Sequence, residues 1–134
     1  MSSRKTVLLV DDDADFVDRN RVLLESNGYR VRIAHSGQEC LDKVSVLRPD
    51  LIILDMMMES ENVGFDLSRE LRNSEYTKKI PLVMITSVND LVPFRVEPDR
   101  TWLPVDALIE KPVEPPQLLD VVNRILKGGN EWAS

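Results

Sequence analysis

The sequence predicts an α/β protein built on a doubly wound parallel sheet of five strands in the order 2-1-3-4-5. Apolar runs such as Leu51–Leu54 show no polar alternation, which is typical of strands buried on both faces. Segments with a helical spacing of apolar residues separate these runs, and strands that alternate with helices form parallel sheets. The length of 134 residues suits one domain with a core of its own.

The first part of the chain contains a buried strand, a helix and an edge strand. Thr6–Val10 is a continuous apolar run. Residues 14–27 place apolar side chains among charged ones and lead to Gly28, a residue type that commonly follows a helix. Tyr29–Ala34 alternates apolar residues with arginines, which predicts a half-exposed strand at one edge of the sheet.

The next unit leads into the central strand. Ser36 and Glu39 have the spacing of a capping box, in which the hydroxyl accepts from the Glu39 N–H and the carboxylate reaches back to the N-cap. The helix that they open ends before Pro49. Leu51–Leu54 then forms the central strand, and the single carboxylate of Asp55 ends it at the mouth of the expected cleft.

The second half of the chain predicts two more strands and two more helices. Phe65–Asn73 has the spacing of a helix, and Leu82–Ile85 and Ala107–Ile109 are apolar runs that predict strands. Residues 115–126 form a last amphipathic helix with proline at its start. Between the two strands, three prolines exclude one long regular helix over 88–105, so we expect an irregular loop in this segment.

Composition excludes several classes of protein. The net charge of −6 argues against direct nucleic-acid binding and against an anionic membrane surface. The apolar runs are far shorter than the roughly 20 residues that span a bilayer, so no membrane insertion is expected. Cys40 is the single cysteine, which excludes an internal disulfide and argues against a cysteine zinc site. Because the chain predicts a strand from its first residues rather than a leader, we expect a cytoplasmic protein.

Polar residues follow four of the predicted strands, and these strand ends lie at the same edge of a parallel sheet. Asp11–Asp13 follow the first strand, Asp55 the third, Thr86 the fourth and Lys111 the fifth. Clustered carboxylates repel one another and require a cation, and hard oxygen ligands suit Mg²⁺. A lysine and a hydroxyl nearby suit a phosphate that shares the metal. Taken singly, none of these residues is specific, because a run of aspartates is often a solvated turn and a lone threonine or lysine after a strand is usually structural.

The motifs at these strand ends resemble a known family. The chain is similar to the receiver domain of bacterial two-component response regulators, of the stand-alone chemotaxis type, through its VLLVDDD, LIILD, ITS and EKP motifs. The resemblance covers residues 5–127 and leaves 128–134 as a loose C-terminal tail. It implies the flavodoxin-like receiver fold and a Mg²⁺ cofactor. It also implies that Asp55 accepts a phosphoryl group from a phosphohistidine of a sensor histidine kinase or of a histidine phosphotransfer protein.

The resemblance assigns the metal ligands. Asp12 is expected to bind Mg²⁺ directly and Asp11 through a water molecule, while Asp13 contributes only negative charge. Asp55 shares the ion, and Met57 offers its backbone carbonyl.

The resemblance also assigns the groups around the phosphoryl oxygens. Thr86 is the switch hydroxyl, Ser87 adds a contact, and Lys111 stabilises the developing charge. The Lys111–Pro112 peptide bond is expected to be cis, as in members of the family.

The sequence departs from the family pattern in several respects. Leu108 stands where the family usually has an aromatic residue, and the proline-rich segment 88–105 replaces the usual fourth helix. Met57 and Val88 occupy the positions that influence hydrolysis of the acyl phosphate, and neither side chain can orient water. We therefore expect at most slow self-dephosphorylation and no other enzymatic activity.

Two other functions stay open at this point. A pseudo-receiver would act as an interaction module and never take a phosphoryl group. A Mg²⁺-dependent phosphatase with an aspartyl-phosphate intermediate needs a second acid two residues after its nucleophile, where this chain has Met57. For a response regulator we expect a separate downstream protein, which the sequence does not name, and a homodimer is left open.

Overall fold

The computed structural model describes residues 4–55, 63–86 and 105–127. The irregular loop expected at 88–105, except Val105, and the tail at 128–134 lie outside the described residues. No helix in the described part is long and apolar enough to cross a bilayer. The elements are β1 (Thr6–Val10), α1 (Ala14–Ser26), β2 (Arg30–Ala34), α2 (Gly37–Leu47), β3 (Leu51–Asp55), α3 (Val63–Asn73), β4 (Leu82–Thr86), β5 (Ala107–Glu110) and α5 (Pro115–Leu126).

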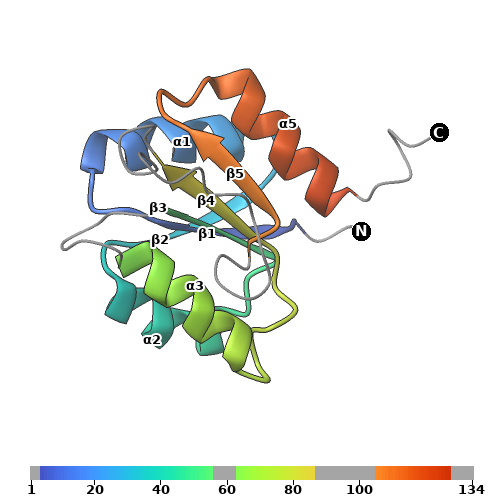
Figure 1. Ribbon diagram of the computed structural model, residues 1–134. Helices are drawn as coiled ribbons and strands as arrows, with labels where there is room; N and C mark the ends of the chain where they lie inside the picture. Colours follow the sequence, from blue (N-terminus) through green and yellow to red (C-terminus); the bar gives the residue numbers. More distant parts are fainter. Residues whose placement is uncertain (1–3, 56–62, 87–104, 128–134) are drawn as a thin grey trace.

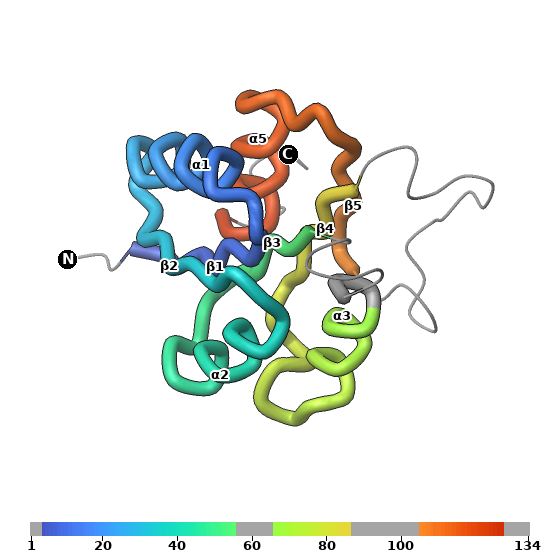
Figure 2. The backbone as a smooth tube through the Cα atoms, turned by 90° about the vertical axis from the view of Figure 1, so that its left-hand side faces the viewer, coloured from blue at the N-terminus to red at the C-terminus, as the bar shows by residue number. Residues whose placement is uncertain are grey.

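The five strands form one parallel sheet in the order β2-β1-β3-β4-β5, which confirms the predicted topology. Helices α1 and α5 cover one face of the sheet, and α2 and α3 cover the other (Figure 1). The view turned by a quarter shows the same three layers, with the sheet between the two helix pairs (Figure 2). Because all strands run the same way, their carboxyl ends share one edge of the sheet.

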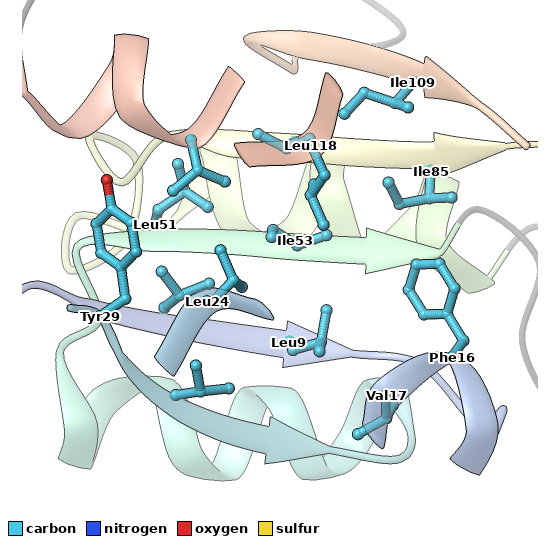
Figure 3. Packing of buried hydrophobic residues seen from close by; sticks show 14 residues of the cluster. Leu9, Phe16, Val17, Leu24, Tyr29, Leu51, Ile53, Ile85, Ile109 and Leu118 are labelled. Atoms are coloured by element: carbon cyan, nitrogen blue, oxygen red, sulfur yellow. The ribbon is translucent and has the colours of Figure 1, made fainter. Parts of the chain in front are cut away.

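The core lies on both sides of the sheet, and strand residues alternate between the two sides. Leu9, Ile53 and Ile85 pack under α1 and α5 together with Leu24 and Leu118 (Figure 3). The alternate strand residues pack under α2 and α3, among them Leu8, Ile52, Leu54 and Met84. Every residue of β3 is buried, as the unbroken apolar run predicts.

Strand β2 is the half-exposed edge strand that the alternation predicts. Its ladder to β1 uses alternate residues, since Arg30 N–H donates to the preceding segment and Ala34 O accepts from Asp11 N–H. The carbonyls of Val31 and Ile33 therefore face away from β1. Lys43 Nζ lies 2.5 Å from Ile33 O, and the Arg32 side chain donates to the carbonyl next to it. Two cationic side chains thus occupy acceptors on the free edge.

The start of α2 confirms half of the predicted capping box and corrects the other half. Ser36 Oγ accepts from Glu39 N–H at 3.1 Å, as expected. The Glu39 carboxylate, however, accepts from the N–H of His35 and not from that of Ser36. This bond and the nearby Lys43 ammonium lower the pKa of Glu39. The helix ends at Arg48 in a left-handed conformation, with φ of 48°, directly before the proline that was expected to stop it.

Two features of the second half were not predicted. Helix α3 begins at Val63, two residues before the expected start. Arg72, near its end, donates to the carbonyl of Ile80 and forms an ion pair of 2.6 Å with Asp106. The Asp106 carboxylate also accepts from Leu82 N–H at 2.8 Å. This pair therefore joins the end of α3 to the entrances of β4 and β5.

Candidate functional site

Asp55 is a buried carboxylate at the end of the central strand. Its side chain is only 5% exposed, and its Oδ2 lies 2.9 Å from Nζ of Lys111, whose side chain is 34% exposed. An unpaired carboxylate at this depth would be costly, and the ammonium supplies both charge and a hydrogen bond. The structure thus brings together the two residues that the sequence placed at the ends of the third and fifth strands.

Asp11 is the second buried carboxylate of the site. It is fully buried, its Oδ1 accepts from Asp13 N–H at 2.9 Å, and its Oδ2 has no hydrogen-bond partner in the described part of the chain. Burial raises the pKa of Asp11 to about 7, the Asp13 N–H opposes this rise, and the charge of Asp55 adds to it. A cation would satisfy the unpartnered oxygen and relieve the repulsion between the two acids.

The alternation of strand side chains explains why these residues meet. Asp55 is two residues after Ile53 and therefore lies on the α1/α5 side of the sheet. Asp11 and Lys111 stand in the same relation to Leu9 and Ile109, which belong to the same core cluster. The site is thus a polar continuation of the core under α1 and α5.

Lys111 is held as a cation in this setting. Burial works to lower its pKa, but the hydrogen bond to Asp55 and the charges of Asp55, Asp11 and Asp13 outweigh burial and raise the pKa. The Lys111–Pro112 peptide bond is cis, as expected. The backbone N–H of Lys111 also donates to Thr86 O at 2.6 Å, which joins the end of β4 to the residue that follows β5.

The remaining predicted site residues fall into two groups. Thr86 is fully buried at the end of β4, where it follows Ile85 and faces the opposite side of the sheet. Asp12 is exposed beside Asp11. Met57 and Ser87 lie outside the described residues. Within residues 4–55, 63–86 and 105–127, no three acidic, histidine or cysteine side chains are grouped as a metal centre. Asp11 and Asp55 are the buried acids of the site, and so few protein ligands suit an ion that keeps several waters.

The arrangement of these residues agrees with a comparison of the chain with known protein families. The family model described as the response regulator receiver domain matches residues 7–123. This chain belongs to that family. Its fold, its five-strand order and its family were all predicted correctly from the sequence.

Individual relatives of the receiver domain agree with this assignment. The DNA-binding response regulator MtrA of Mycolicibacterium paratuberculosis is 31% identical over 128 residues, which cover 96% of this chain and 54% of that protein. The chain thus spans about half the length of the curated relatives it matches. A putative response regulator from Chloroflexus aurantiacus has a TM-score of 0.81 at 28% identity, covering 94% of this chain and 100% of that one. Chemotaxis response regulator CheY4 of Vibrio cholerae has a TM-score of 0.77 at 27% identity, covering 92% and 99%.

The receiver domain contains two site contacts that the sequence analysis missed. Asp13, to which only negative charge was assigned, is the N-cap of α1, and its Oδ1 accepts from the N–H groups of Asp15 and Phe16. An acid three residues before the first apolar residue of a helix was a signal for this cap. The Phe16 ring, an apolar side chain of the helix predicted over 14–27, also lies 5.6 Å from Nζ of Lys111.

Protonation of Asp11 gives this receiver domain an expected pH dependence. Its pKa is about 7 in the fold against 3.8 in an unperturbed aspartate, so between these values the folded chain holds a proton that the unfolded chain releases. Its contribution to the free energy of unfolding therefore falls as pH rises from about 4 to about 7, by roughly 2–4 kcal/mol in the absence of metal. Urea unfolding at pH 5 and pH 8 would measure this change.

The matched variants isolate the contribution of this one carboxyl group. Asp11→Asn should lose that part of the pH dependence, while Asp18→Asn, an exposed acid on α1, should keep it. Added Mg²⁺ should raise the Tm more at pH 8 than at pH 5, because a metal ligand must be deprotonated. An Asp11→Asn variant with the wild-type pH dependence would contradict the assignment.

Proposed function

We propose that Asp55 of this receiver domain accepts a phosphoryl group from the phosphohistidine of a sensor histidine kinase or histidine phosphotransfer protein. The observation that carries the proposal is the pairing of buried Asp55 with Lys111 at 2.9 Å, beside the unpartnered oxygen of Asp11. A nucleophilic carboxylate, a fixed cation and an acidic side chain that can hold a metal ion are the groups that phosphoryl transfer requires.

The transfer follows from the positions of these groups. An Asp55 oxygen attacks phosphorus in line, a new P–O bond forms, and the P–N bond to the donor imidazole breaks. The electron pair of that bond stays on the imidazole nitrogen, which takes up a proton. Lys111 stabilises the charge on the phosphoryl oxygens. Because Asp55 is held at the end of a buried strand, its carboxylate is in place before the donor arrives.

Mg²⁺ fits the acidic pair. Receiver domains of this family typically bind it. Asp11 supplies a buried oxygen without a partner, and Asp55 supplies a second carboxylate. We propose these two and Asp12 as side-chain ligands, with the Met57 carbonyl as a further ligand. When bound, the ion neutralises the carboxylates and the phosphoryl oxygens.

Thr86 and Ser87 are proposed to contact the phosphoryl group, and Thr86 has a backbone link to the site. Its carbonyl accepts from Lys111 N–H, so the end of β4 is bonded directly to the residue that pairs with Asp55. We propose that a separate downstream protein recognises the phosphorylated domain. The relative MtrA is a DNA-binding response regulator, whereas for this chain we propose a protein partner and no direct nucleic-acid contact.

Phosphorylation by a small donor tests the proposal. The protein incubated with phosphoramidate and Mg²⁺ should gain one phosphoryl mass in intact-mass spectra, and EDTA should prevent the gain. The product should be an acyl phosphate that hydroxylamine cleaves. A pseudo-receiver would gain no mass, and a phosphatase would release inorganic phosphate steadily from small phosphate esters.

A further inference from the structure

The ring of Phe16 lies beside the site. Phe16 is 5% exposed on the first turn of α1, and its ring centroid lies 5.6 Å from Nζ of Lys111. Figure 3 shows Phe16 at the end of the core cluster toward which the strand arrows point, beyond Ile53 and near Ile85. The ring therefore closes the core at the carboxyl edge of the sheet, where Lys111 meets Asp55.

The backbone of Phe16 is held on both sides. Its N–H donates to Asp13 Oδ1 at 3.3 Å, and its carbonyl accepts from the buried Asn20 side chain at 2.8 Å. Asp13 in turn donates its own N–H to Asp11 Oδ1 at 2.9 Å. These hydrogen bonds thus join Asp11, through Asp13, to the turn that carries the ring. The placement of the ring is linked to the site and not only to the core.

The ammonium of Lys111 therefore has two attractive partners of different character. Its hydrogen bond to Asp55 Oδ2 is short and directional. Attraction to the face of an aromatic ring acts within about 6 Å of the centroid and tolerates a shift of the cation. A cation that must leave one oxygen for another can therefore keep the ring as a constant partner.

We propose that Phe16 is a positioning residue that holds the Lys111 ammonium at the site while Lys111 exchanges the Asp55 carboxylate for the oxygens of an incoming phosphoryl group. The inference rests on the proposed function of Asp55. Phe16 acts through Lys111. A leucine of similar size would fill the core here but would not attract the ammonium.

A double-mutant cycle tests this role. Phe16→Leu should lower the rate constant for phosphoryl uptake from phosphoramidate about fivefold to tenfold, the range of a partly desolvated cation–π contact. Phe16→Tyr keeps the ring face and should restore most of the rate. In a Lys111→Met background, Phe16→Leu should have no further effect, because the cation is absent. Val17→Ala, a buried position of the same helix, is the control for lost packing and should change the rate less than twofold.

A spectroscopic readout separates this inference from the proposed function. The ε-methylene protons of Lys111 should show an upfield ring-current shift in NMR spectra of the wild type and of Phe16→Tyr, and should lose it in Phe16→Leu. An unshifted wild-type signal, or a Phe16→Leu effect that persists in the Lys111→Met background, overturns the role of Phe16 and leaves phosphorylation of Asp55 intact. A wild type that takes no phosphoryl group overturns both the proposed function and this role in transfer, even where the shift shows that the contact exists.

Discussion

Asp55→Asn is expected to abolish phosphoryl uptake completely, with no gain of mass under conditions that fully phosphorylate the wild type. The amide is close in size to the carboxylate but has no anionic oxygen to attack phosphorus. Intact-mass spectra after incubation with phosphoramidate and Mg²⁺ would measure the loss. The substitution also removes the charge that helps to raise the pKa of Asp11, so that pKa should fall toward its ordinary value.

The control for Asp55→Asn is Asp42→Asn, which alters an exposed acid of α2 that bonds only Gln38 among the described contacts. It should take up the phosphoryl group at the wild-type rate. A stable acyl phosphate on the Asp55→Asn protein would show that another carboxylate is the acceptor and would end the proposal.

Lys111→Met is expected to slow phosphoryl uptake about 10²- to 10³-fold, the usual effect of losing one fixed charge partner of a transition state. The methionine keeps the length and the apolar part of the side chain but has no ammonium to meet Asp55 at 2.9 Å. Stopped time courses of phosphorylation at saturating Mg²⁺ would measure the rate constant.

The same Lys111→Met variant should bind Mg²⁺ more tightly than the wild type. Without the ammonium, the field of Asp11 and Asp55 is more negative, and the ion has no competing cation. Lys78→Met, which breaks an exposed pair with Glu75, is the control and should leave both quantities unchanged. Weaker Mg²⁺ binding by Lys111→Met would contradict this electrostatic account of the site.

The strands and the location of the site could be predicted because local sequence determines both. The run Leu51–Leu54 has no polar residue and is bounded by turn signals, which is typical of a strand with two buried faces. Strict alternation then places Asp55 on a known side of the sheet, and parallel strands bring their ends to one edge. The acid–lysine pair was therefore predictable from strand ends alone.

Contacts between distant segments could not be predicted in the same way. Arg72 and Asp106 are far apart in the sequence, with a strand and an irregular segment between them, so no local pattern marks them as partners. Phe16 has the spacing of a core residue, and only the packing of α1 across the sheet brings its ring to Lys111. The Glu39 carboxylate accepts from the N–H of His35, one residue before the N–H that the capping pattern predicts. Which N–H it contacts depends on the local path of the turn.

The side chains over the free edge of β2 have a consequence for behaviour at high concentration. An open strand edge is a template on which another copy of the chain can add a strand and begin a fibril. Here an added strand from another copy would first have to displace Lys43 from Ile33 O, and its backbone would then lie beside the Lys43 ammonium. Replacing Lys43 with an apolar residue would therefore be a poor choice in any variant prepared at millimolar concentration for spectroscopy.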